Sequence, residues 1–161
     1  MRNTAFLAGM ETLERRDTPS GAVPYGLPPR VAPISGSGTA TVAAPVVTGQ
    51  FVRTAFSVKG VGQSGPLQGA FVGAGTGTLA PKYPAIASAV LTLANGDQVD
   101  VKFHGKVMPS KTPGVQLANL GFKLVDVGPK FSGATGNGTL TGTINVSTGV
   151  MVFTYRGNIR Y

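Results

Sequence analysis

The sequence predicts an all-β protein, a closed eight-stranded antiparallel up-and-down barrel behind a disordered N-terminal leader. Three observations support this prediction. From residue 35 to residue 161, apolar and polar residues alternate with the period of two that is typical of half-buried strands. Prolines fall between the alternating segments. The 24 glycines lie among Thr and Val rather than in low-complexity tracts, which favours strands joined by tight turns.

The first 34 residues differ from the rest of the chain. Residues 10–16 have the potential to form a short helix that ends at the segment Asp17–Gly21. A cluster of prolines follows, and it favours an extended linker that cannot join the interior of a sheet. We therefore expect a leader and linker over residues 1–34 and a barrel domain over residues 35–161. The prolines of the linker are Pro24, Pro28, Pro29 and Pro33.

The strands follow from the alternation. Within residues 98–107, Val99 and Phe103 fall on one face, whereas Asp100 and Lys102 fall on the other, and helical spacing does not fit. The same pattern recurs along the chain. The predicted strands are residues 35–43, 51–60, 67–79, 86–94, 98–107, 119–126, 138–146 and 151–161.

The residues between these segments are typical of connections. Asn95-Gly96 predicts a type I′ hairpin turn, and Ser147-Thr148-Gly149 is expected to close the final hairpin. Eight short strands with one apolar face each form either a two-sheet sandwich or a closed barrel, and the regular spacing favours the barrel. Seven prolines are expected to lie between strands and none within one: Pro45, Pro66, Pro81, Pro84, Pro109, Pro113 and Pro129.

The leader contains a short recognisable segment. Residues 11–20 hold a Leu13-Glu14-x-Arg16 core just before the Pro-rich linker. This segment resembles the N-terminal LExLExR sorting element of surface and secreted proteins of planctomycete bacteria, although Thr18-Pro19 replaces the usual Leu-Leu. The resemblance implies an extracellular or cell-surface location. Residues 5–8 are too short for the apolar region of about 7–15 residues in a standard secretory signal.

The C-terminal half contains a second recognisable segment. Residues 128–143 read GPKFSGATGNGTLTGT, and residues 93–97 form an Asn-Gly-Asp hairpin. Both resemble the allene oxide cyclase-like and dirigent-like barrel superfamily. The resemblance implies an eight-stranded antiparallel barrel, often a homo-oligomer. It does not carry an activity across, because residues 35–161 contain no glutamate, and the plant cyclases use one in the cavity.

On several predicted strands, the alternate positions expected to face inward (the inward parity) carry aromatic residues. The simplest interpretation is core packing; the alternative is a lumen that binds a small apolar ligand, since barrel mouths are recurrent ligand sites. Asp126 continues the parity of Leu120, Phe122 and Leu124 and is expected at the barrel mouth. The candidate ligand-binding residues are Phe71, Phe103, Phe122, Asp126, Phe153 and Tyr155.

The barrel segment lacks the residue sets of common catalytic and metal sites. The chain has no cysteine, and its one histidine, His104, lies between two lysines on a polar strand face. The three aspartates do not pair for acid–base catalysis. We therefore predict no catalytic residue, metal or cofactor, and favour a non-enzymatic role.

The chain is strongly basic, with a formal net charge of +8. Its lysines and arginines are scattered singly, which predicts a dispersed soluble surface or a surface for polyanions such as an anionic polysaccharide, and no specific nucleic-acid tract. No apolar run reaches the roughly 20 residues of a membrane-spanning helix.

Three functions remain open. The first is a secreted or cell-surface module that binds a partner or serves a structural role without catalysis. The second is an isomerase or cyclase that acts on a small apolar molecule in the lumen. The third is a surface protein that binds polyanions.

Overall fold

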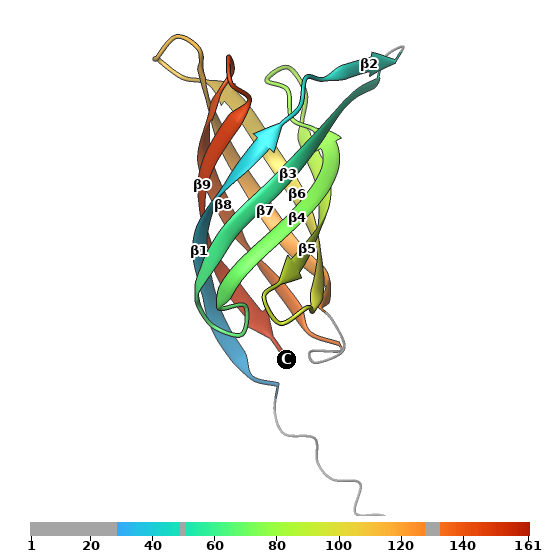
Figure 1. Ribbon diagram of the computed structural model, residues 1–161, viewed down its shortest axis with the longest axis vertical. Coiled ribbons are helices and arrows are strands. Elements are labelled where there is room, and N and C mark those ends of the chain that lie inside the picture. Colours follow the sequence, from blue (N-terminus) through green and yellow to red (C-terminus); the bar gives the residue numbers. More distant parts are fainter. Residues whose placement is uncertain (1–28, 49–50, 128–132) are drawn as a thin grey trace, which may run out of the picture.

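The computed structural model describes residues 29–48, 51–127 and 133–161, so only the last six residues of the predicted leader are among them. Every regular element in this part of the chain is a β-strand (Figure 1). Within it we find no apolar helix of membrane-spanning length. The strands are β1 (Val31–Val42), β2 (Val46–Thr48), β3 (Phe51–Ser64), β4 (Gly69–Thr78), β5 (Ala85–Leu93), β6 (Gln98–Pro109), β7 (Val115–Val127), β8 (Thr135–Asn145) and β9 (Val150–Arg160).

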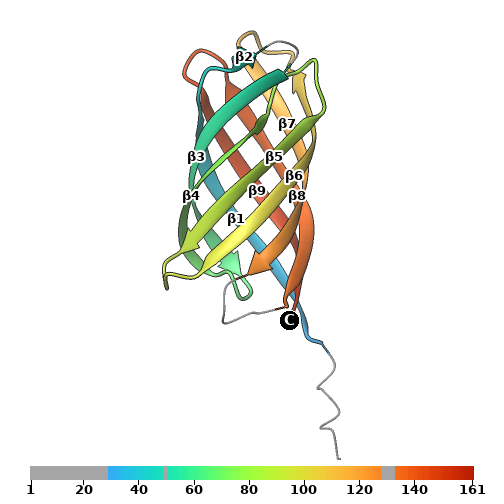
Figure 2. The ribbon, with the colours of Figure 1, turned by 90° about the vertical axis from the view of Figure 1, so that its right-hand side faces the viewer.

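The strands close into a barrel. Each of the strands β3 to β8 pairs antiparallel with the next, and β1 pairs with both β9 and β3, which completes the ring. Figures 1 and 2 show the tilted strands around a single axis, with the described chain ends at the lower end. The predicted fold class, a closed eight-stranded antiparallel up-and-down barrel, is confirmed.

The strands are strongly staggered. A path through directly paired residues that leaves β6 at Gln98 and passes once around the barrel returns to β6 at Met108, ten residues further along. Such a stagger requires the strands to tilt against the barrel axis, and an eight-stranded barrel has an interior just wide enough for its side chains to fill or for one small ligand.

The inward parity of every barrel strand supplies the core. Inward side chains are almost all apolar, and Thr54 is the only polar side chain among the buried residues that the structure describes. The outward residues of the same strands are mostly exposed. The largest fully buried side chains are Ile34, Val99, Val107, Val127 and Ile159.

Inward glycines make room for inward rings. A Cβ atom at Gly60 would lie 2.5 Å from Cζ of Phe71 and 2.5 Å from the carbonyl oxygen of Ser37, so only glycine fits beneath this ring. The ring and its glycine are directly paired on neighbouring strands, and the same arrangement recurs around the barrel. The directly paired residues are Phe71 and Gly60, Phe56 and Gly75, Phe122 and Gly138, Phe153 and Gly38, and Tyr155 and Gly36.

Two predictions about prolines need correction. Pro109 is the last residue of β6, and Pro33 lies inside β1, which begins four residues before the predicted strand. Pro33 pairs with Asn158 of β9 before the pairing of β1 with β3 begins at Ser35. Pro109 pairs with β7 beyond the end of the pairing with β5. Each proline therefore has a strand neighbour on one side only. Proline is tolerated at such an edge position, because its missing N–H then costs no ladder hydrogen bond.

The predicted type I′ turn at Asn95-Gly96 is wrong. No residue other than glycine has a positive φ in the described part of the chain, and Gly96 has φ +88°. The amide of Gly96 donates to the carbonyl of Leu93 over 2.9 Å, and the amide of Asp97 donates to Oδ1 of Asn95 over 3.0 Å. Asn95 thus supports the turn through its side chain instead of adopting the left-handed conformation.

The sequence did not predict β2. This short strand pairs only with β3 and extends the β1–β3 connection beyond the upper end of the barrel (Figure 1). Val46 and Val47 point to opposite faces and are 64% and 66% exposed, because no barrel wall lies behind either face.

Candidate functional site

Five of the six predicted ligand-binding residues lie on the inward parity of the barrel. Phe71, Phe122 and Phe153 are buried, and Phe103 and Tyr155 are partly buried. The ring of Tyr155 meets the rings of Phe71 and Phe122 edge to face, with both centroid distances at 6.1 Å. Such aromatic contacts add to the stability of the core.

The lumen retains little empty space. A lower cavity of about 60 Å³ lies among Phe71, Phe122 and Tyr155, and Leu67 of the β3–β4 connection also lines it. An upper cavity of about 40 Å³ lies near Val42 and Met151. Small-molecule sites usually enclose about 300 Å³ or more. The lumen as it stands therefore has no room for a small-molecule ligand.

Tyr155 brings the one phenol into this apolar interior. Burial raises the pKa of its hydroxyl, since the charged form is poorly solvated there. A phenol with a raised pKa is a weaker proton donor, and its basic phenolate form is less populated at neutral pH. Among the described residues, no second titratable side chain lines the lower cavity with it.

Asp126, the sixth predicted residue, lies on β7 beside a β-bulge. The pairing of β6 with β7 shifts between Asp100 and Val101, and the register places Asp126 opposite Asp100. The alternation of buried side chains on β7 therefore runs to Leu124, and the next buried residue is Val127. The side chain of Asp126 lies outside the described residues.

The other titratable residues considered for chemistry lie on the outer side. Asp97 belongs to the β5–β6 turn, where its carboxylate accepts a hydrogen bond of 2.8 Å from the Asn95 amide. Asp100 and His104 are exposed on β6. The His104 ring lies over Gly121 of β7, since a Cβ atom at Gly121 would lie 2.7 Å from its Nε2. Among the described residues no group of three His, Cys, Asp or Glu side chains could hold a metal ion.

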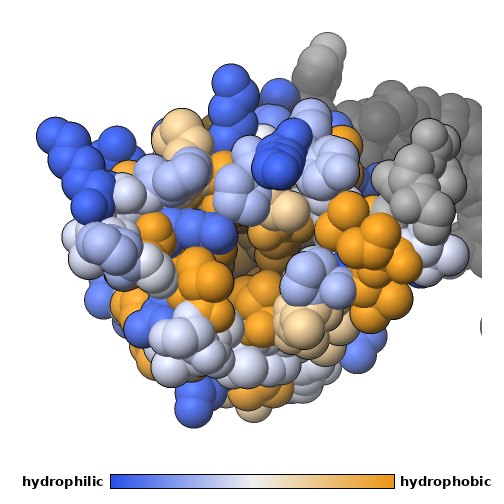
Figure 3. Space-filling model, turned by 90° about the horizontal axis from the view of Figure 1, so that it is seen from above, coloured by the Kyte–Doolittle hydropathy of each residue, from blue (hydrophilic) through white to orange (hydrophobic). Residues whose placement is uncertain are grey.

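The upper end of the barrel is apolar at its centre. Figure 3 looks onto this end and shows hydrophobic residues around a central depression, with hydrophilic residues around the rim. Half-buried Val42 and Leu79 belong to the hydrophobic core beneath it. The small upper cavity near Val42 and Leu79 lies at this end of the barrel.

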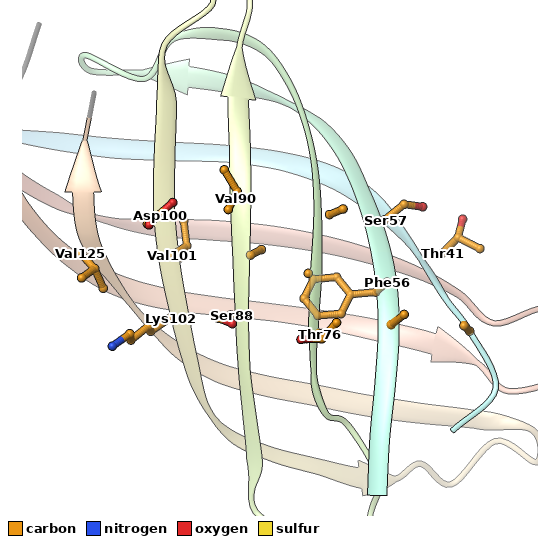
Figure 4. Close-up of a pocket in the computed structure, with 15 residues that line it drawn as sticks. Thr41, Phe56, Ser57, Thr76, Ser88, Val90, Asp100, Val101, Lys102 and Val125 are labelled. Carbon is orange, nitrogen blue, oxygen red and sulfur yellow. The ribbon is translucent and has the colours of Figure 1, made fainter. Parts of the chain in front are cut away.

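A large hollow lies on the outside. A groove of about 910 Å³ crosses the outer wall from the end of β1 to β6. Its floor consists of small residues, chiefly Ala55, Ala74, Thr76 and Ser88. Figure 4 shows Thr41 towards one end of this groove and Asp100 and Lys102 together on β6 towards the other. We call this hollow the outer groove.

A second hollow adjoins the outer groove below β2. It measures about 890 Å³ and shares Thr76, Ser88 and Lys102 with the groove, and Val46 and Thr48 of β2 overhang it. Sequence reasoning missed both hollows. The small outward residues of β3 to β5 were visible, but their side-by-side alignment depends on strand register.

Comparison of the chain with models of known families, with curated proteins and with solved structures gives no match. The candidate site is therefore argued from its geometry.

Proposed function

We propose that this protein is a non-catalytic binding module at the cell surface or outside the cell, and that its partners contact the outer wall of the barrel. One observation carries the proposal: the lumen holds cavities of only about 60 and 40 Å³, whereas the outer wall holds a groove of about 910 Å³. Space for a partner exists outside the barrel and not inside it.

The chemistry of the outer groove supports binding over bond breaking. The charged residues that line it are Asp100 and Lys102, and its hydroxyl groups come from threonines and serines with no histidine among the lining residues. A hydroxyl nucleophile needs a base within hydrogen-bond reach, and among the described residues no hydrogen bond joins Asp100 to a hydroxyl of this lining. Hydroxyl and methyl groups over a shallow floor suit contacts with an extended ligand.

Location and kinship are part of the same proposal. The leader segment around Leu13-Glu14-x-Arg16 supports export to the cell surface. The segment over residues 128–143, together with the eight-stranded barrel, supports kinship with allene oxide cyclase-like and dirigent-like proteins. From that kinship we infer only the barrel scaffold, and no chemistry in the lumen.

Methyl NMR tests where ligands bind. The protein, with labelled Leu, Val and Ile methyl groups, is titrated with apolar probes that increase in size from benzene to a sesquiterpene. We expect no saturable shift of the buried methyls of Leu124, Leu140 and Ile159. The exposed methyls of Val72 and Val90 serve as the control for weak surface contact. A saturable shift of the buried methyls would overturn the proposal.

A reporter experiment tests the proposed export of the protein. A reporter protein is fused after residue 34 of this chain and, separately, after a scrambled version of residues 11–20, and both are expressed in a planctomycete host. We expect the reporter outside the cell only with the natural leader. Equal retention of both fusions in the cell would remove the export part of the proposal.

A further inference from the structure

Four cations share one part of the outer wall. Lys102 and Lys106 lie on β6, Lys123 on β7 and Arg156 on β9, and all four are exposed. Because each occupies an outward position of its strand, the four side chains project from the outer wall over the four neighbouring strands β6 to β9. We call this region of β6 to β9 the cationic face.

The register brings these cations together. Lys102 and Lys123 are directly paired, which places their Cβ atoms about 5 Å apart. Lys106 follows Lys102 by four residues, about 13 Å along the same strand. Arg156 pairs with Thr139 of β8, whose neighbour on β7 is Gly121, two residues from Lys123. Arg156 lies three strands from β6, so the Cα atoms of the four residues spread over about 13 to 16 Å of the curved wall.

Acidic partners of these cations are absent from the side chains that the structure describes on this face. None of the four makes an ion pair within the described part of the chain. Asp100, at the margin of the face, is the described carboxylate that shares a strand with Lys102. The side chain of Asp126, opposite Asp100, lies outside the described residues. His104 lies between Lys102 and Lys106, with its ring over Gly121 of β7. The neighbouring outward positions carry polar uncharged residues: Asn119, Asn137, Thr139, Thr141, Thr154 and Asn158.

Lys102 and Lys123 carry like charges at directly paired positions of β6 and β7. Like charges directly opposite each other on a sheet are destabilising. Lys102 and Lys123 stand in this arrangement with no described carboxylate bonded to either. An anion placed between the two ammonium groups removes the repulsion, so the fold gains stability when such an anion binds.

We propose that the cationic face binds an anionic polysaccharide, with its sulfate or carboxylate groups against Lys102, Lys106, Lys123 and Arg156. This inference rests on the proposed outer-wall function and names its ligand class. The intervening Asn and Thr side chains offer donors and acceptors to sugar hydroxyls. Lys102 also lines the outer groove, so a long chain bound at the face continues along the small-residue floor.

The same face is poorly suited to nucleic acid. Proteins that bind single strands stack bases on exposed aromatic side chains, and those that read duplexes place a helix or ribbon in a groove. The exposed aromatic residues in the described part of the chain are Tyr83, in the β4–β5 connection, and Tyr161, after β9. Neither lies among the four cations.

Matched charge variants test the proposal in the full-length protein. One variant carries Lys102→Gln, Lys123→Gln and Arg156→Gln. Its control removes the same charges elsewhere: Arg53→Gln and Lys59→Gln on β3 and Lys82→Gln in the β4–β5 connection. Fluorescence anisotropy measures binding to labelled heparin and labelled polygalacturonate, with neutral dextran, single-stranded DNA and duplex DNA of similar length as further probes.

We expect the wild-type protein to bind at least one of the two anionic polysaccharides at about 50 mM salt and to lose affinity steeply as salt rises, because binding releases counterions. The face variant should bind about tenfold more weakly and show a shallower salt dependence, whereas the control variant changes about twofold or less. Polysaccharide should also raise the Tm of the wild type more than that of the face variant.

Several outcomes would overturn the inference. The first is that neither polysaccharide binds, and the second is that the face variant and the control variant lose affinity equally. The third is an affinity that does not fall as salt rises, and the fourth is tighter binding of DNA than of both polysaccharides. Circular dichroism confirms that both variants keep the fold. These failures are separate from failure of the proposed function, which depends on whether buried methyl groups respond to apolar probes.

Discussion

The inner and outer sides of the barrel wall are built from alternate residues of the same strands, yet they differ in nearly every property. The inner side is apolar, with Thr54 as the one buried polar side chain among the described residues. Its cavities measure about 60 and 40 Å³. The outer side carries small, polar and cationic residues over hollows of about 910 and 890 Å³.

Because of this difference, the inner side of the wall determines the stability of the fold, and the outer side is open to interactions with partners. A close-packed interior responds to the loss or gain of a single methyl group, because neighbouring atoms have no free space to move into. An exposed wall tolerates such changes, since solvent fills or vacates the space. The same substitution should therefore have a large effect at an inward position and a small effect at an outward one.

Truncation of an inward ring should give the largest effect. Phe122→Ala removes a buried ring that contacts Tyr155 and covers Gly138, and we expect a loss of about 3–5 kcal/mol in the free energy of unfolding. Val125→Ala, on the outward parity of the same strand, should cost less than about 1 kcal/mol. Urea unfolding measures both. A similar cost for the two variants would mean that the lumen is not close-packed.

The pair of variants Gly60→Ala and Gly121→Ala compares one added methyl group on the two sides. At Gly60 the new Cβ meets the ring of Phe71 and the backbone oxygen of Ser37, both at 2.5 Å, so we expect a loss of about 1–3 kcal/mol. At Gly121 it meets only the exposed ring of His104, which has room to turn away. Gly121→Ala should therefore be neutral or stabilise by several tenths of a kcal/mol. Thermal unfolding of both variants tests the difference, and the reverse order would contradict it.

The strands were predictable because alternation depends only on neighbouring residues. Val99, Val101 and Phe103 fall inside and Lys102 outside, as their parity requires. Strand β2 was not predictable in this way, since Val46 and Val47 are both exposed and three residues form no periodic pattern. The bulge beside Asp126 was also hidden, because it arises from the pairing of two strands.

The candidate sites depend on register, which parity alone does not supply. Parity places Lys102 and Lys123 on the outer side, but only the pairing of β6 with β7 brings them face to face. Likewise, parity predicts inward rings, but whether the rings leave a pocket depends on their partners. Phe71 lies over Gly60 and Phe122 over Gly138, and these pairs let the rings fill the lumen.

The smallest expected effect concerns Tyr155, the phenol inside the lumen. Burial raises its pKa above the ordinary value of 10.0, so the neutral form is favoured in the folded protein. This contribution to stability is complete below pH 10.0 and is lost as the pH rises through the folded-state pKa.

Wild type should therefore lose stability above pH 10 more steeply than Tyr155→Phe, which keeps the ring and lacks the titrating group. Urea midpoints at pH 9 and pH 11 measure this difference, and titration of the lysines contributes equally to both proteins. Parallel losses in the two proteins would show that water reaches the phenol, and the contrast between a dry inner side and a wet outer side would then fail at this point.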